Sequence, residues 1–314
     1  MNANSPLAKP AAEHDRTART GLAFGLFAYA FWGVLPIYFK ALAGVPAIDI
    51  VAHRIVWSLL VLAALLGVTR GWSQVAAALR DRRTLGLLTT TALLIGVNWL
   101  LYVYAINSGH ILAGSLGYYL NPLANILLGR FILKEHLSRL QWLAVAIAGA
   151  GIAVLAAGAL GELWISLTLC VSFATYGLLR KIAAVDSIAG LSIETAILFP
   201  LALGWLIAGY AAGEPTFGSG TQQAVLLVLA GIVSTTPLLL FTAAARRLRY
   251  STLGILQFIA PTLQFICAVW LYGEPFTTAH AIAFGAIWTA LALYVASLIH
   301  SMRAAARCTE LTCG

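Results

Sequence analysis

Charged residues are scarce in this chain. Only 10% of its 314 residues are Asp, Glu, Lys or Arg, while 61% are hydrophobic and the mean hydropathy is +0.90. A soluble protein of this length needs far more charge to cover its surface, because Lys, Arg, Asp and Glu supply most of the water-facing positions. The composition therefore excludes an ordinary soluble fold and predicts a protein embedded in a membrane.

Signatures of metal, redox and nucleotide chemistry are missing as well. Cys170 and Cys267 fall in apolar runs, and Cys308 and Cys313 fall in a polar tail, so their spacing indicates neither a zinc site nor a redox pair. The sequence has no H-E-x-x-H motif, no G-x-x-x-x-G-K-[ST] phosphate loop and no pair of aspartates inside an apolar run. We expect no cofactor, no metal and no catalytic residues, which makes a membrane-embedded enzyme the least favoured class.

What the chain does contain is long apolar runs. Windows of about 20 residues are long enough to cross a bilayer as helices. Ten such runs are predicted, at residues 21–42, 48–69, 85–106, 111–133, 139–158, 162–180, 191–212, 223–245, 251–272 and 278–300. The predicted fold is an all-α polytopic membrane protein with ten transmembrane helices.

The basic residues are distributed unevenly along this pattern. Seventeen of the 19 Lys and Arg residues precede span 1, follow span 10 or lie in the loops after spans 2, 4, 6 and 8. Basic residues accumulate on the cytoplasmic side, so both termini are expected in the cytoplasm of a multi-pass protein of the bacterial inner (plasma) membrane. Residues 1–20 and 301–314 would be cytoplasmic tails. This distribution accounts for the net charge of +8 without a nucleic-acid partner.

Two segments 139 residues apart resemble one another. Residues 112–135 and 251–274 each carry a proline followed thirteen residues later by a glutamate. The matching pairs are Pro122 with Pro261, Glu135 with Glu274, Tyr118 with Gln257 and Asn125 with Gln264, and in the neighbouring spans Asn98 lies opposite Pro237. Residues 21–158 and 162–300 are therefore predicted to be two five-helix repeats. Since five is odd, the second repeat enters the membrane from the opposite side, an arrangement typical of secondary transporters.

Six short motifs are spread along the chain: F-W-G (31–33), H-R-I-V-W-S (53–58), S-L-G-Y-Y-L-N-P-L (115–123), K-E (134–135), E-T (194–195) and L-Q-F-I-A-P-T (256–262). In these motifs the chain resembles the EamA-type members of the drug/metabolite transporter superfamily, and within them the RarD group. The likeness covers about residues 20–300. It implies ten spans in two inverted halves and a plasma-membrane permease, but it names no substrate.

Polar residues inside the fourth and ninth spans are candidates for a solute site. Tyr118, Asn121 and Asn125 share one helical face. Pro122 and Pro261 each remove a backbone donor, and a carbonyl freed in this way should face protein or a water-filled cavity. We expect these breaks, with a third at Pro237, to supply polar groups to an internal cavity shared with Gln257 and Gln264. The alternative is that the prolines kink helices and the amides tie helices together.

Other polar residues extend the candidate site. Asn98, Trp99 and Tyr102 form a polar and aromatic strip, for which helix packing is the alternative. Lys40 and Arg54 are the two basic residues outside the cytoplasmic tally. Arg54, with His53 and Trp57, could attract a carboxylate, or could pair with Asp49 or with lipid phosphate.

Glu194 is the one carboxylate expected within a span, apart from residues at span ends. It could bind a proton or cation, with Lys40 as a second coupling candidate, or it could cap its helix from the first turn.

Together these features predict a permease that exports small amino-acid-like or drug-like solutes by alternating access. A passive, channel-like facilitator remains an alternative, since it would use similar polar faces. The expected partners are a small-molecule solute and membrane lipid, and the sequence leaves a homodimer open.

Overall fold

The computed structural model describes residues 11–312, except for 43, 108–110, 158–159, 214–216, 218–219 and 274–277. Glu274, one of the paired glutamates, lies outside the described residues. The described part of the chain is predominantly helical and has no strand. This agrees with the predicted all-α class.

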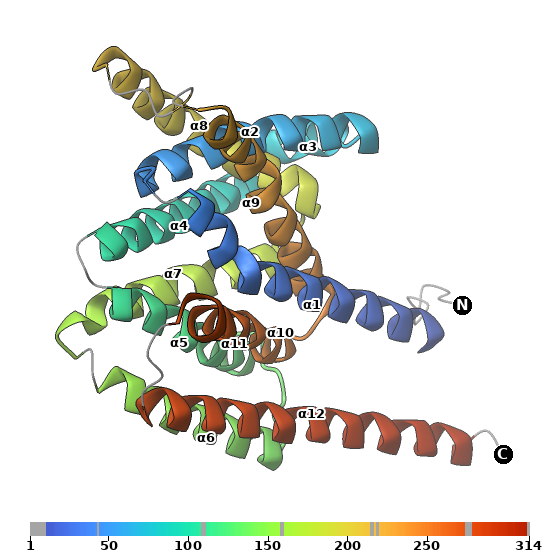
Figure 1. Ribbon diagram of the computed structural model, residues 1–314. Helices are drawn as coiled ribbons and strands as arrows, with labels where there is room; N and C mark the ends of the chain where they lie inside the picture. The colour runs from blue at the N-terminus through green and yellow to red at the C-terminus, as the bar shows by residue number, and fades with distance from the viewer. Residues whose placement is uncertain are drawn as a thin grey trace, which may run out of the picture.

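The helices divide into two successive groups (Figure 1). The first comprises α1 (Ala11–Ala41), α2 (Ala47–Thr69), α3 (Trp72–Arg80), α4 (Arg82–Asn107), α5 (Ile111–Phe131) and α6 (Arg139–Ala156). The second begins with a 3₁₀ turn, η1 (Leu160–Glu162), and comprises α7 (Leu163–Ile182), α8 (Ser187–Ala211), α9 (Thr221–Arg247), α10 (Tyr250–Gln257), α11 (Ile259–Ile266), the π-helical turn η2 (Cys267–Leu271) and α12 (Thr278–Thr312).

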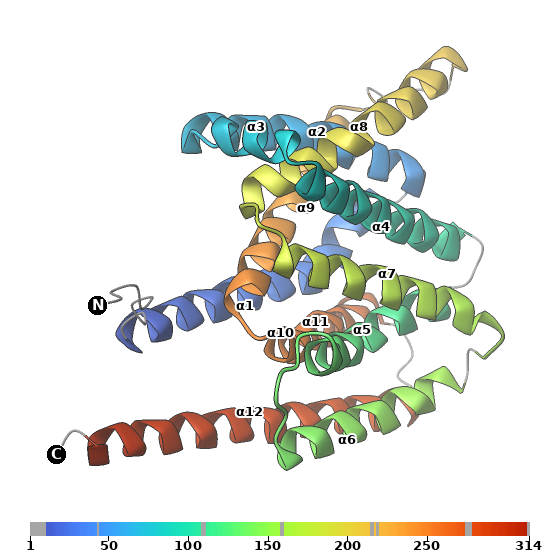
Figure 2. The same cartoon turned by 180° about the vertical axis from the view of Figure 1, so that it is seen from behind.

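Nine helical segments of the described chain are long and apolar enough to cross a membrane, with α10, α11 and η2 together forming one of them. Helix α5, the fourth predicted span, is not among the nine, although its 21 residues extend about 30 Å. The first turn of α1 and the last turn of α12 lie on the same side of the molecule in Figures 1 and 2. A chain whose ends share a side crosses an even number of times, and counting α5 gives ten.

Some predicted boundaries need correction. Helix α1 begins at Ala11, inside the predicted N-terminal tail, and α12 continues through the predicted C-terminal tail to Thr312. Helix α3 was not predicted; its Ala78 is buried against α4 and α8. Helix α8 begins at Ser187, four residues before the predicted start of its span, because Asp186 caps it by accepting a hydrogen bond from the Ile188 N–H.

Most contacts between the two groups of helices have a counterpart in which the corresponding helices of the two groups are exchanged. Helix α1 packs against α9 and α11, and in the other group α7 packs against α4 and α5. Helix α9 packs against α2 as α4 packs against α8, while α2 with α8, α5 with α10 and α6 with α12 each join like members of the two groups. Figures 1 and 2 both show α6 and α12 side by side along one edge. An approximate two-fold exchange of the groups would give this set of contacts.

The prolines do not all end helices. The predicted break occurs in the ninth span, where α10 ends at Gln257 and α11 begins at Ile259, two residues before Pro261. Helices α5 and α9 instead run through Pro122 and Pro237 without interruption. At these two positions the expected break is corrected to a continuous helix with one hydrogen bond fewer, because a proline removes a donor without forcing the helix to end.

Candidate functional site

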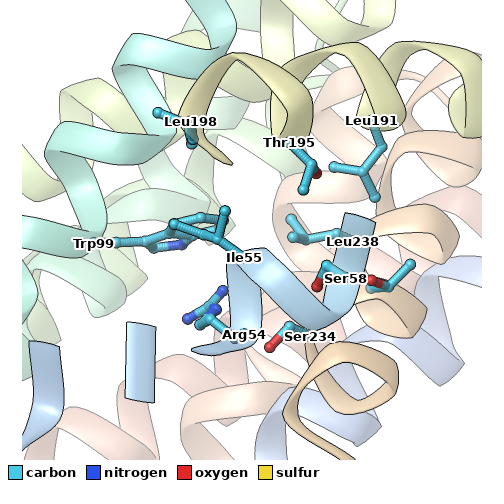
Figure 3. A pocket seen from close by; sticks show the side chains of 10 residues that line it. Arg54, Ile55, Ser58, Trp99, Leu191, Thr195, Leu198, Ser234 and Leu238 are labelled. Atoms are coloured by element: carbon cyan, nitrogen blue, oxygen red, sulfur yellow. The ribbon is translucent and has the colours of Figure 1, made fainter. Parts of the chain in front are cut away.

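A small cavity lies between α2, α4, α8 and α9 (Figure 3). Its polar and aromatic lining consists of Arg54 and Ser58 from α2, Trp99 from α4, Thr195 from α8, and Ser234 and Thr235 from α9. The volume is about 10 Å³, which is room for about one water molecule. In this conformation the cavity is closed to any metabolite.

Arg54 and Trp99 face one another across this cavity. The Cζ atom of Arg54 lies 4.0 Å from the centroid of the Trp99 ring, a cation–π contact (Figure 3). Tyr38 and Tyr118 also lie within electrostatic range of the guanidinium. The stacked Trp99 ring leaves the edge of the guanidinium, which carries its N–H donors, available to a planar acceptor.

Three buried donors around Arg54 have no hydrogen-bond partner among the described residues: Arg54 Nε, Trp57 Nε1 and Thr235 Oγ1. A buried donor without an acceptor costs free energy, so such groups are uncommon and indicate a missing partner. Two of the three can only donate, since guanidinium and indole nitrogens accept no hydrogen bond. The chemistry that complements them is an oxygen-rich, negatively charged group.

The outer approach to this group is aromatic. Helix α2 begins after Pro46, and His53 and Trp57 point toward Phe217, with ring centroids 5.5 Å and 6.0 Å from the Phe217 ring. Helix α9 packs closely against the same turn of α2. A Cβ added to Gly231 would lie only 2.6 Å from the backbone carbon of Trp57, so the absence of a side chain at Gly231 allows this approach. Ser58 Oγ donates to the Gly231 carbonyl at 3.2 Å. The α2 residues of the site are thus held against α9 at backbone distance.

The predicted polar face of α5 lies elsewhere, packed against α10. Asn125 donates through Nδ2 to Gln257 Oε1 at 2.7 Å, and both side chains are buried. The helices touch closely here, since a Cβ on Gly254 would lie 2.7 Å from the Pro122 carbonyl oxygen. Asn125 and Gln257 therefore join two helices in this conformation instead of lining the cavity.

Asn121, on the same helix, is fully buried, and neither side-chain atom has a hydrogen-bond partner among the residues described. A buried amide usually satisfies at least one of its two groups. Its two free groups distinguish it from Asn125, and they make it the polar residue of α5 with most capacity left for a ligand.

The remaining predicted site residues have other contacts. Asn98 donates to the Leu169 carbonyl and to Ser172 Oγ, both at 2.9 Å, so its donors tie α4 to α7. Gln264 donates to the Trp32 carbonyl of α1 at 3.0 Å. The Tyr102 and Tyr118 rings meet edge to face, with centroids 5.3 Å apart. Lys40 is exposed at the end of α1, with its ammonium 5.1 Å from the Tyr272 ring centroid, and does not line the cavity.

Glu194 belongs to a second buried polar cluster. It lies seven residues after the start of α8, so the alternative of a first-turn cap is wrong. Arg180 Nε lies 3.6 Å from Glu194 Oε1, Thr91 Oγ1 donates to the same oxygen at 2.5 Å, and Tyr176 OH donates to Oε2 at 3.3 Å. Both charged side chains are buried, at 0% and 1% exposure.

The sequence analysis missed Thr91, Tyr176 and Arg180, and it counted Arg180 with the cytoplasmic loop after span 6. Arg180 is instead fully buried and lies inside the segment Leu163–Ile182, where its Nη2 donates to the Ser187 carbonyl at 3.3 Å. A signal was present, because Tyr176 and Arg180 are four residues apart and so share one face of a helix.

Glu135, in the loop between α5 and α6, contacts the first turn of α10. Its carboxylate accepts from the Tyr250 N–H at 2.6 Å, from the Ser251 N–H at 3.0 Å and from Ser251 Oγ at 2.6 Å. The loop between α5 and α6 thereby caps the first turn of α10, a helix of the other group. Lys181, on α7, binds the C-terminal end of α9, where its ammonium donates to the Ala245 and Leu248 carbonyls.

Comparison with known proteins places these features in a family context. Residues 19–157 match the model of the EamA-like transporter family. An uncharacterized transporter of Vibrio cholerae is 45% identical over 93% of this chain and 97% of its own. Protein RarD of Salmonella typhimurium is 44% identical over 92% and 98% of the two chains, and protein RarD of Escherichia coli is 42% identical over the same shares.

A solved crystal structure superposes on the chain with a TM-score of 0.68, covering 88% of this chain and 97% of that one. The sequence identity is 20%, so this likeness supports the fold alone.

Proposed function

The chain belongs to the RarD group of the EamA-like transporter family, and from this premise we propose that it is a secondary permease rather than an enzyme. It moves small anionic or zwitterionic metabolites, amino-acid-like or drug-like in size, out of a bacterial cell by alternating access. The protein is a multi-pass membrane transporter; the solute class, the direction and the mechanism are the proposed part.

The observation that carries the solute class is the Arg54 group. A partly buried guanidinium stacked on Trp99, with further unpartnered donors on Trp57 and Thr235, has the charge and the hydrogen-bond donors that a carboxylate requires. The ion pair between Arg54 and Asp49 stays an alternative; the Asp49 carboxylate accepts a hydrogen bond from Trp205 Nε1 at 2.7 Å.

Alternating access is supported by the small volume of the cavity and by the paired contacts between the two groups of helices. The cavity beside Arg54 holds about one water, so a solute must enter through a rearrangement of the surrounding helices. The exchangeable helix contacts are those expected of two related repeats, residues 21–158 and 162–300, and inverted repeats of this kind can rock against one another. A channel-like facilitator stays the alternative, and exchange kinetics distinguish it from a carrier.

The test starts from the solute. Metabolites secreted by cells with and without the gene are compared, and a carboxylate-bearing solute that differs is then used for counterflow into liposomes containing the purified protein. Counterflow requires saturable exchange, so a passive channel would give none.

Arg54→Ala should lower counterflow about 10- to 100-fold, the loss of one or two hydrogen bonds between charged groups. Arg54→Lys, which keeps the charge but loses the planar fork, should fall between. Lys40→Ala is the matched control, because it removes an exposed cation that does not line the cavity. Wild-type exchange by Arg54→Ala at equal protein levels would contradict the assignment of this site.

A further inference from the structure

The cluster around Glu194 has no role in the solute site described above. It joins three helices: Thr91 on α4, Tyr176 and Arg180 on α7, and Glu194 on α8. A buried carboxylate inside a membrane segment is costly and is usually found on ion or proton pathways. Among the spans of the described chain, Glu194 is the carboxylate that lies deeper than a first turn.

We propose that Glu194 is a proton-binding site that couples proton movement to transport, with Arg180 as its fixed counter-charge. This inference rests on the proposed permease function and adds the driving ion. The argument has three parts: the fixed position of Arg180, the hydroxyl groups on Glu194, and the helices that Glu194 connects.

Arg180 cannot follow a change at Glu194. Its guanidinium fills the space of the missing side chain at Gly190, where an added Cβ would lie 2.0 Å from Arg180 Nη1. Nη2 is held by the Ser187 carbonyl, and neither Nε nor Nη1 has a hydrogen-bond partner within the described part of the chain. The cation is therefore positioned by packing, and the carboxylate is the member of the pair that can change its charge.

The hydroxyl partners of Glu194 can accommodate a proton. Thr91 Oγ1 lies 2.5 Å from Glu194 Oε1 and also 2.9 Å from the Leu88 carbonyl, but it has only one hydrogen to donate. When Glu194 is ionised, that hydrogen points to the carboxylate. When Glu194 is protonated, its own O–H can donate to Thr91, whose hydrogen turns to Leu88. Both states leave the Thr91 hydroxyl and the Glu194 oxygen that it faces hydrogen-bonded to each other.

The proton changes a contact between the two repeats. Glu194 and Arg180 belong to the second repeat, whereas Thr91 belongs to the first. Protonation replaces a hydrogen bond to a charged acceptor by a weaker neutral one, so it loosens α4 from α8. The next residue, Thr195, lines the cavity that also holds Arg54. Proton binding and solute binding thus act on the same turn of α8.

The other ionisable groups on helices that pack against α8 have contacts elsewhere or are exposed. His53 on α2 lies against the Phe217 ring, and Arg82 and Arg83 on α4 are exposed. On α2, Arg54 faces the cavity and Asp49 accepts from Trp205. On α9, Arg246 pairs with Asp186 at 3.3 Å. On α3, Arg80 is exposed.

The test measures the proton directly and needs no solute. The purified full chain is reconstituted in liposomes, and infrared difference spectra are recorded while the pH is lowered from mildly alkaline to mildly acidic. The wild type should gain the carbonyl-stretch band of a protonated carboxylic acid. Glu194→Gln should lose that band, while the exposed control Asp186→Asn should keep it. Absence of the band in the wild type, or its persistence in Glu194→Gln, would overturn the proposal.

Two milder variants guard against a failure of Glu194→Gln to fold. Thr91→Val removes a donor from the ionised carboxylate and should raise its proton affinity about tenfold, the effect of one hydrogen bond to a charged group. Tyr176→Phe removes the longer 3.3 Å bond and should raise the affinity less. Identical titrations in the wild type and Thr91→Val would contradict the role of the hydroxyl.

The outcome is separable from that of the permease proposal. Counterflow that depends on Arg54, with Glu194 ionised at every pH, would keep the permease and reject the proton site. A titrating Glu194 without Arg54-dependent counterflow would keep Glu194 as a proton-binding residue and reject Arg54 as the solute site.

Discussion

Glu135→Ala should destabilise the protein more than the loss of an ordinary loop carboxylate. Helix α10 has Arg249 at its N-cap position, and this residue makes no capping hydrogen bond with its side chain. The acceptor for the first turn comes instead from Glu135, through contacts of 2.6 Å and 3.0 Å to the Tyr250 and Ser251 N–H groups. The carboxylate is 10% exposed, so little water is available to replace it.

The size of the effect follows from these contacts. Removing a capping acceptor costs about 0.5–2 kcal/mol, and a hydrogen bond to a charged group contributes about 1.5–3 kcal/mol. The contacts share one carboxylate and do not add, because water reaches part of the exposed end of α10 after truncation. We expect Glu135→Ala to lower the free energy of unfolding by about 2 kcal/mol. Glu135→Gln keeps one acceptor oxygen and should lose about 1 kcal/mol.

The assay is reversible unfolding of the purified protein in mixed micelles, followed by helical circular dichroism. The matched control is Asp186→Ala. Asp186 is an acidic residue that caps α8 and is 49% exposed. Unlike Glu135, it caps a helix of its own group. Its cost should be well below that of Glu135→Ala. Equal costs, or no cost at Glu135, would refute the conclusion that this residue caps α10 from the other repeat.

Two further predictions concern packing and topology. The Asn125–Gln257 hydrogen bond should give a coupling energy of about 1 kcal/mol in a double-mutant cycle with Asn125→Leu and Gln257→Leu, measured by the same unfolding assay. Additive effects of the two substitutions would show that this hydrogen bond does not stabilise the contact between α5 and α10. Reporter fusions at Gly213 should read periplasmic and fusions at Gly71 cytoplasmic, as the distribution of basic residues requires, and the opposite result would invert the proposed orientation.

Much of the fold could be predicted because the membrane limits the alternatives. Apolar length determines a span, and nine helical segments of the described chain meet the criterion without any tertiary information. The ends were less predictable, because α8 begins where Asp186 caps it and α12 extends well past the apolar run. Capping and helical continuation depend on local polar residues, which hydropathy does not weigh.

The candidate site was predictable only in part. Hydropathy assigns an arginine near a span end to the loop, so Arg180 was placed outside the membrane, although its partner Glu194 is separated from it by only fourteen residues. Helical periodicity correctly put Asn121 and Asn125 on one face, but a face does not state what it contacts. The structure packs that face against α10, because Gly254 allows the two backbones to approach.

In the proposed mechanism, Arg54 and Glu194 give the two groups of helices different ligands. Arg54 lies seven residues after the start of α2, and Glu194 lies seven residues after the start of α8. The two helices pack against each other and begin at opposite faces if the repeats are inverted. Each charge is then about 10 Å along its helix from the face at which that helix begins, with the cation nearer one face and the carboxylate nearer the other.

The direction of transport by a carrier is set by the gradients of its solute and coupling ion, and the two charges determine which ligand each position can bind. The cation at Arg54 suits a carboxylate, and the carboxylate at Glu194 suits a proton. A solute anion at Arg54 and a proton at Glu194 also act on neighbouring turns of α2 and α8, which close the cavity together. Exchanging the charges by Arg54→Glu with Glu194→Arg should therefore not restore counterflow, because Arg180 stays fixed beside the new cation and repels it. Recovery of exchange in that double variant would show that the charge pair matters and its placement does not.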